Sequence, residues 1–411
     1  METPKVLKSV LAVLILLFVN LAWGAASEQV LYSFSGADGV PAGLVSDGAG
    51  NLYGTTYAGG AYSQGSVFEL SPSTSGWTRS VLYSFTGGRD GRSPSESESL
   101  VFDTAGNLYG TTVRGGSGSG TVFKLAPNGG GGWTESVIHY FKNAPAHYPE
   151  SGLVFDAAGN LYGTAFGSPG AVFELSPTSS GPWKIRILHK FGKTRRDGIG
   201  PLAALAFDPA GNLYGTTYVG GVPKCGLGEM GCGTVFKLTP ASGGAWRYSR
   251  IYSFAGGANG DRPYAGVVSD AAGNLYGTTA LGGNTGCDSN SDGCGIVFEL
   301  SPNLDGTWTE TLVYSFAGSA IDGGEPFSGL IFDHAGNLFG TTYIGGSSGF
   351  GTVFELTPQS GGWQETVLHN FADSDGQLPL VGVISNAAGN LYGTTITGGA
   401  TGGGAAFEVT P

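Results

Sequence analysis

The chain has 411 residues, of which 76 are glycine, 12% are aromatic and 12% are charged. The aromatic content argues against disorder, because a disordered chain lacks the apolar surface that offsets its ordering entropy. The net charge is −12, with no Lys/Arg cluster at any repeated position, which argues against nucleic acid as a partner.

Residues 1–26 are predicted to be a secretory signal peptide. Lys5 and Lys8 precede the apolar run Val10 to Val19, and Gly24 to Ala26 offers a cleavage site of small residues. An uncleaved anchor helix is the alternative, but the run is shorter than the roughly 20 residues that a span needs. We therefore expect an exported chain, secreted or at the cell surface, with no membrane span after cleavage.

A strand-like run, Val30 to Phe34, follows this segment and recurs six more times. The later copies are Val81–Phe85, Val137–Phe141, Ile187–Phe191, Arg250–Phe254, Leu312–Phe316 and Val367–Phe371. A Trp precedes each of these six copies by a few residues, whereas the first copy has none. Next come a Gly-rich turn that ends in Pro and a short apolar strand that ends in Asp, as in Gly43 to Asp47.

An Asp-x-Ala-Gly-Asn link after that strand predicts a tight hairpin, because Asp suits the start of a turn and Gly-Asn tolerates positive φ. The signature Gly-Asn-Leu-Tyr-Gly-Thr-Thr follows, first at Gly50 to Thr56, and its later copies begin at Gly106, Gly159, Gly211, Gly273, Gly336 and Gly389. A variable Gly-rich loop then leads to a strand of the type Val-Phe-Glu-Leu, first at Val67 to Leu70.

Seven units with a period of 52 to 63 residues therefore fill the chain, each with four short strands. This predicts one all-β domain over residues 27–411, a seven-bladed β-propeller with four antiparallel strands per blade. A β-solenoid is the alternative, but solenoid coils are usually shorter. The last unit lacks its fourth strand, so we expect Val30 to Phe34 to join it and close the ring.

These repeated motifs resemble the GloVer (Gloeo_Verruco) tandem-repeat family of exported bacterial proteins, over about residues 30 to 411. The Asp-x-x-Gly-Asn-Leu-Tyr part is also similar to NHL-like propeller repeats. That similarity implies that the Gly-Leu-Val-x-Asp strand is innermost and the Leu-Tyr-Ser-Phe strand outermost. The resemblance implies no settled activity and no catalytic residues.

With that strand order, the turns into each innermost strand share one face of the disc with the variable loops. Six of these turns carry an Asx-Gly pair, which is typical of turn chemistry but is also consistent with a ligand-binding ring at the channel mouth. The Asx residues of the ring are Asp38, Asp90, Asp197, Asn259, Asp322 and Asp375. A symmetric set of this kind argues against catalysis, which needs one asymmetric site.

The variable loop of the fifth unit matches the ligand pattern of a calcium loop. Asp288, Asn290 and Asp292 alternate before Gly293, and Glu299 takes the twelfth position. Glu299 also belongs to the repeated strand, so a merely polar loop is the alternative. Calcium is the one cofactor that the sequence suggests.

The four cysteines predict two local disulfides in an oxidising compartment, Cys225 with Cys232 and Cys287 with Cys294. A four-cysteine zinc site between neighbouring units is the alternative, although the spacing is wider than in zinc knuckles.

Three of the five histidines, His139, His189 and His369, replace Tyr in the outermost strand and are expected to be structural, and His334 lies in a hairpin on the opposite face. His147 is the one weak candidate for an acid or base, because it is expected on the binding face beside Tyr148.

The leading hypothesis is a monomeric, non-catalytic propeller that binds a glycan or an extracellular protein on its loop-rich face. An extracellular lyase or hydrolase acting on polysaccharide is the second hypothesis, and a structural component of the cell envelope is the third. Asymmetry distinguishes them, because an enzyme needs one funnel with unlike groups.

Overall fold

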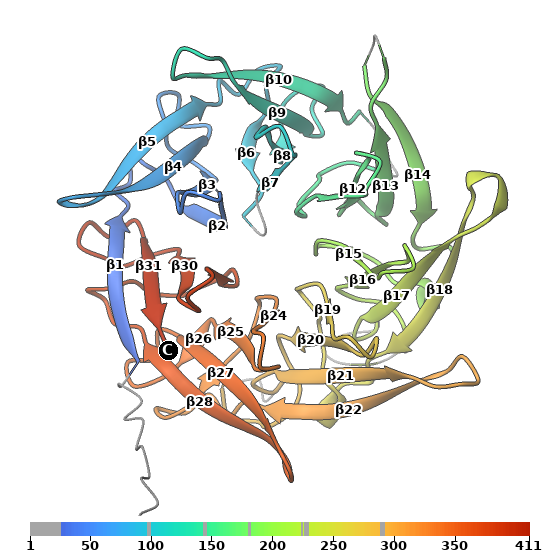
Figure 1. The fold of residues 1–411 in the computed structure, drawn as a ribbon. Coiled ribbons are helices and arrows are strands. Elements are labelled where there is room, and N and C mark those ends of the chain that lie inside the picture. Colours follow the sequence, from blue (N-terminus) through green and yellow to red (C-terminus); the bar gives the residue numbers. More distant parts are fainter. Residues whose placement is uncertain are drawn as a thin grey trace, which may run out of the picture.

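The computed structural model describes residues 26–96, 100–142, 146–179, 182–222, 225, 230–287 and 292–411. Seven four-stranded antiparallel sheets form a ring around a central channel, as the sequence predicts (Figure 1). The predicted signal peptide, apart from Ala26, lies outside the described residues, as do Asp288 and Asn290 of the predicted calcium loop.

Each blade contains four strands that follow one another from the channel to the rim. Blade 1 has β2 (Pro41–Ser46), β3 (Leu52–Thr56), β4 (Ser66–Ser73) and β5 (Gly76–Ser84); blade 2 has β7 (Leu100–Phe102), β8 (Leu108–Arg114), β9 (Thr121–Pro127) and β10 (Trp133–Tyr140). Blade 3 has β11 (Val154–Phe155), β12 (Leu161–Ala165), β13 (Ala171–Ser176) and β14 (Lys184–Lys190); blade 4 has β15 (Ala206–Phe207), β16 (Leu213–Thr217), β17 (Thr234–Pro240) and β18 (Trp246–Ser253).

Blade 5 has β19 (Val268–Ser269), β20 (Leu275–Thr279), β21 (Ile296–Pro302) and β22 (Trp308–Ser315); blade 6 has β24 (Ile331–Phe332), β25 (Leu338–Thr342), β27 (Thr352–Gln359) and β28 (Gly362–Asn370). Blade 7 has β29 (Ile384–Ser385), β30 (Leu391–Thr395), β31 (Ala405–Thr410) and β1 (Ser27–Ser33). Further short elements are β6 (Arg92–Pro94) beside β8, the pair β23 (Gly323–Gly324) and β26 (Ile344–Gly345), and 3-10 turns at Arg195–Asp197, Ser242–Gly244 and Gly257–Asn259.

The outermost strands are longer than the sequence predicts. The run expected at Val137–Phe141 belongs to β10, which begins at Trp133 and contains a register shift between Val137 and His139. The strand extends back to the Trp because β10 pairs along the whole of β9, from Trp133 opposite Pro127. The Trp ring also packs on a signature Tyr of the preceding blade, as Trp133 does on Tyr53 at 6.3 Å between ring centroids.

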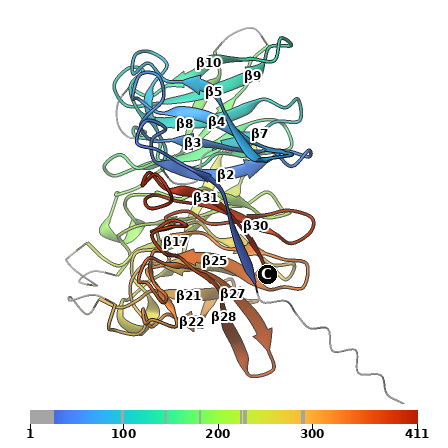
Figure 2. The same cartoon turned by 90° about the vertical axis from the view of Figure 1, so that its left-hand side faces the viewer.

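The predicted ring closure is confirmed. β1 pairs antiparallel with β31, from Ser27 opposite Thr410 to Ser33 opposite Ala405. Both views show β1 running beside β31 (Figures 1 and 2). Because the first and last strands share one sheet, blade 7 holds both ends of the domain together.

The glycine in the middle of the signature strand is explained by an aromatic ring that covers it. A Cβ on Gly54 would lie 2.7 Å from Cζ of Phe68, and the other six blades repeat this contact. The covering ring also meets, edge to face, the Phe that ends the outermost strand of the preceding blade, as Phe34 meets Phe68 at 5.2 Å. These fully buried Phe residues form the core between blades.

In six of the seven blades, the first Thr of the signature bonds to the next blade near the channel, whereas Thr55 of blade 1 makes no such bond to a described residue. Thr216 Oγ1 donates to the carbonyl of Ala265 at 2.9 Å, and Thr394 Oγ1 donates to the carbonyl of Ala42 across the closure at 3.0 Å. These bonds hold in place the turns that lead into the innermost strands. They therefore also position the side chains on those turns.

Both predicted disulfides are present, Cys225 with Cys232 and Cys287 with Cys294, and they close loops on the same face. No helix among the described residues is long and apolar enough to cross a membrane.

Candidate functional site

A cavity of about 400 Å³ occupies the channel on the loop-rich face, which is the size of ordinary small-ligand sites. Its walls come from two kinds of position. One is the first one to three residues after the turn Pro, such as Glu150 and Tyr264. The other is the first or second residue after Gly-Thr-Thr, such as Tyr57 and Arg114. All seven blades thus converge on one space, but with different side chains.

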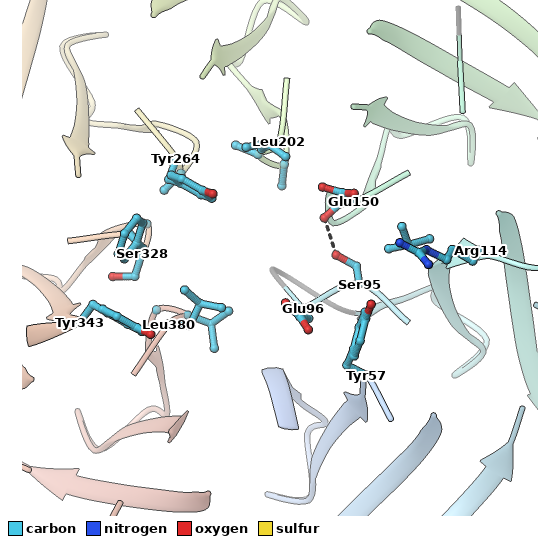
Figure 3. Close-up of a pocket in the computed structure, with 18 residues that line it drawn as sticks. Tyr57, Ser95, Glu96, Arg114, Glu150, Leu202, Tyr264, Ser328, Tyr343 and Leu380 are labelled. Atoms are coloured by element: carbon cyan, nitrogen blue, oxygen red, sulfur yellow. Dashed lines mark hydrogen bonds between the residues drawn. The ribbon is translucent and has the colours of Figure 1, made fainter. Parts of the chain in front are cut away.

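One side of the cavity is aromatic and aliphatic. Tyr264 meets Phe327 edge to face at 4.9 Å, and Phe327 meets Tyr343 in the same way at 5.2 Å. Leu202 and Leu380 extend this wall, and Figure 3 shows them with Tyr264 and Tyr343 on one side of the space. The wall comes from blades 4 to 7 and offers a partly exposed apolar platform.

The opposite side is polar and mostly acidic. Glu96, Glu150, Arg114 and Ser95 gather there, and the hydroxyl of Ser95 donates to the carbonyl oxygen of Glu150 (Figure 3). Tyr57 of blade 1 completes this side, so the polar half of the cavity comes from blades 1 to 3.

The two carboxyl groups have raised pKa values. Desolvation, together with Glu96 and against the opposing effect of Arg114, raises the pKa of Glu150 to about 7. Desolvation by the channel walls also raises the pKa of Glu96, although its side chain reaches the water of the channel mouth. A carboxyl with a pKa raised this far can donate or accept a proton near neutral pH.

The acidic side affects the aromatic side electrostatically across the cavity. Burial raises the pKa of Tyr264, and Tyr218, Glu150 and Glu96 add to this effect. The hydroxyl of Tyr264 therefore stays protonated near neutral pH. The cavity combines hydrogen-bond donors, carboxyl acceptors and an apolar platform in one asymmetric arrangement.

Sequence reasoning missed these residues because it searched for what the repeats share. The residue directly after the turn Pro differs in most blades and runs Ala42, Ser95, Glu150, Leu202, Tyr264, Phe327 and Leu380 in chain order. The cavity residues could have been found from the sequence as a position that varies between otherwise similar repeats.

None of the six Asx residues predicted to form a ligand ring lines this cavity. Each lies at the rim, beside its own outermost strand. Asp90 accepts from the amide and hydroxyl of Thr86 and from the hydroxyl of Tyr83. Asp38 pairs with Arg79 at 2.8 Å, and Asp197 and Asp375 contact His189 and His369. Asn259 and Asp322 bond to Glu310 and to the amide of Ala317. Asp90 and Asp322 cap their own turns, whereas Asp38 and Asn259 also reach the outermost strand of the next blade. Ligand binding by the ring stays a prediction.

The other predicted site residues are also placed apart from the cavity. The ring of His147 packs on Tyr148 at 4.7 Å between centroids and does not line the cavity. Glu299 accepts from Ser301 on β21, the same contact that Glu69 makes with Ser71 in blade 1. Asp292 lies in the loop before β21, where its carbonyl accepts from Gly282. The calcium prediction stays untested.

The family model for the Gloeobacter/Verrucomicrobia repeat matches residues 18–227, 131–303 and 224–411. No curated protein matches the chain.

Similar solved structures include a gluconolactonase from Xanthomonas campestris, with 15% identity over 77% of this chain and 86% of that chain and a TM-score of 0.44. A putative 6-phosphogluconolactonase from Bacteroides uniformis has 15% identity over 79% and 83%, with a TM-score of 0.48. A luciferin-regenerating enzyme has 14% identity over 94% and 95%, with a TM-score of 0.43. Likenesses at this level carry no argument about activity.

Proposed function

We propose that this chain, which belongs to the Gloeobacter/Verrucomicrobia repeat family, is an exported propeller that binds a glycan in the cavity at its channel mouth. The observation that carries the proposal is the division of that cavity into an aromatic wall and an acidic wall. A sugar ring has an apolar C–H face and a rim of hydroxyl groups. The first fits Tyr264 and Phe327, and the second fits the carboxyl groups of Glu96 and Glu150.

Two further features support export. The N-terminal segment has the pattern of a signal peptide. The two disulfides suggest an oxidising environment, where such bonds persist.

The test is a glycan-array screen on the secreted chain, followed by affinity measurements on variants. Tyr264→Ala removes the centre of the platform, and we expect at least a tenfold loss of affinity for any glycan that binds the parent chain. Tyr62→Ala is the matched control, because Tyr62 is 58% exposed and lies outside the cavity. The assignment of the cavity is contradicted if both variants lose affinity equally, or if Tyr264→Ala leaves the affinity unchanged.

Polysaccharide cleavage is the second candidate, and the pKa of Glu150 favours it. A carboxyl with a pKa of about 7, beside a second carboxyl and Arg114, is suited to general acid or base chemistry. Incubation of array-positive polysaccharides with the protein, with the products separated by size, distinguishes the two functions. An enzyme loses turnover in Glu150→Gln but keeps binding, whereas a binding module releases no product in either form.

A further inference from the structure

A second cluster of chemically active side chains lies at the rim, where the outermost strands of neighbouring blades meet. Each contact of this kind is called a seam. One position on every outermost strand faces the seam. It is the position paired with the last Leu or Val of the neighbouring strand in the same blade. In chain order it holds Glu28, Arg79, Glu135, Ile185, Tyr248, Glu310 and Glu365.

The partners of this position come from the preceding blade. They are a Tyr or His of its outermost strand and, at every seam except that between blades 2 and 3, the Asx residue of the turn that follows. Glu365, for example, acts electrostatically on both Tyr314 and Asp322. The seam between blades 6 and 7 instead brings together Glu28 of β1, His369 of β28 and Asp375 of the turn.

The three groups at this seam are close and partly shielded from water. One ligand atom from each of Glu28, His369 and Asp375 lies within 4.8 Å of the others. Nε2 of His369 lies 3.2 Å from Oδ2 of Asp375, and these side chains are only 17% and 18% exposed. Oε1 of Glu28 is buried and has no hydrogen-bond partner among the described residues.

We propose that Glu28, His369 and Asp375 bind a divalent transition-metal ion, with Zn²⁺ as the best fit. Imidazole nitrogens and carboxylate oxygens are both ligands that zinc accepts, and a zinc ion held by three protein ligands keeps a fourth position for water. Ligand atoms around tetrahedral zinc lie about 3.4 Å apart, so small side-chain rotations bring the three groups into place. The ion also gives the buried oxygen of Glu28 a partner.

In the described part of the chain, the other seams lack this combination of ligands. Oε1 atoms of Glu135, Glu310 and Glu365 are likewise buried without a partner. Those seams have Tyr in place of His, and among the described residues only the seam between blades 6 and 7 gathers three ligands of metal-binding type.

This seam also lacks a contact that the other six have. Elsewhere a Trp of the outermost strand packs on a signature Tyr of the preceding blade, with ring centroids 5.9 to 6.4 Å apart. Blade 7 has no such Trp, since β1 begins at Ser27, and blade 6 carries Phe339 in place of Tyr. A metal here ties the closing strand to blade 6 where the aromatic contact is missing.

The experiment uses the secreted chain without a polyhistidine tag, stripped with chelator and titrated calorimetrically with ZnCl₂ at pH 7. The parent chain is expected to bind one equivalent of Zn²⁺ and to melt at a higher temperature with zinc than without. Glu28→Gln and His369→Gln are expected to lose the stoichiometric binding and the zinc-dependent shift.

Two variants at other seams provide controls. His189→Gln breaks the equivalent histidine contact with Asp197, at a seam that has Tyr248 where the proposed site has Glu28. This variant is therefore expected to bind one equivalent of zinc, as the parent chain does. Tyr314→His places an imidazole between Glu365 and Asp322, so it is expected to bind a second equivalent. The proposal is overturned if the parent chain does not bind zinc stoichiometrically, or if both Glu28→Gln and His369→Gln bind zinc as the parent chain does. If these two variants do not fold, Tyr314→His still tests the proposal.

Discussion

At the scale of single residues, close packing explains why the signature glycine is repeated. The signature glycine has ordinary dihedral angles, so its recurrence from blade to blade reflects space and not backbone freedom. In blade 4 a Cβ on Gly215 would lie 2.6 Å from Cζ of Phe236 and 2.9 Å from Cδ2 of Leu205. Both neighbours are buried, so neither can move aside without disturbing the contact between blades.

Gly215→Ala is therefore expected to lower the free energy of unfolding by about 1 to 3 kcal/mol, as overpacking of a core does. Denaturant unfolding followed by tryptophan fluorescence measures the loss. Gly36→Ala is the control, because a Cβ there meets nothing within 4 Å, and it is expected to change stability little. Equal stability of the two variants contradicts the steric explanation.

At the scale of elements, β1 has a role that no other strand shares. It is the only described strand that joins its sheet from the opposite end of the domain, and it covers the otherwise open edge of β31. It also delivers Phe34, which is fully buried against Phe68 of blade 1. Pairing and packing at this strand therefore hold the two ends of the ring together.

A mature chain that starts at residue 35 is expected to melt at a markedly lower temperature and to self-associate through the exposed edge of β31. Phe34→Ala keeps the strand but removes its ring, so it is expected to cost about 3 to 5 kcal/mol without exposing that edge. Calorimetry and light scattering measure the two effects. Unchanged melting of the shortened chain contradicts closure by β1.

At the scale of the whole molecule, the acidic seams link stability to pH. Burial, together with Asp375, Asp90 and Asp322 respectively, raises the pKa of Glu28, Glu135 and Glu365 to about 7. A raised pKa means that the folded state holds protons that the unfolded state releases. The contribution of these groups to stability is therefore greatest below a pH of about 4.5 and falls as the pH rises towards 7.

Glu365→Gln tests this link, because glutamine keeps a donor towards Asp322 but cannot ionise. The variant is expected to melt above the parent chain at pH 8 and to lose this advantage as the pH falls below 4.5, where Glu365 becomes protonated in the unfolded state as well as in the folded state. Buried histidines oppose the trend in the parent chain, since burial lowers the pKa of His139 to about 4. Comparing the two chains at each pH cancels that contribution, and a difference that does not vary with pH contradicts the prediction.

The number of blades, the four strands in each, the closure by the N-terminal strand and the two disulfides could all be predicted from the amino-acid sequence. All of these follow from short-range patterns, or from the count of strands in the first and last units. The identity of Gly54 and its six counterparts, for instance, is set within a single blade by the ring of the adjacent strand.

The places where unlike residues meet, in contrast, depend on the folded ring. Glu150 and Tyr264 are more than a hundred positions apart, and no local pattern relates them, yet the curvature of the ring brings both into one cavity. Glu28 and His369 meet because closure places the first strand beside blade 6. The repeat fixes each blade through contacts within it and with its neighbours, whereas the sites depend on the few positions at which the blades differ and on the ring that gathers them.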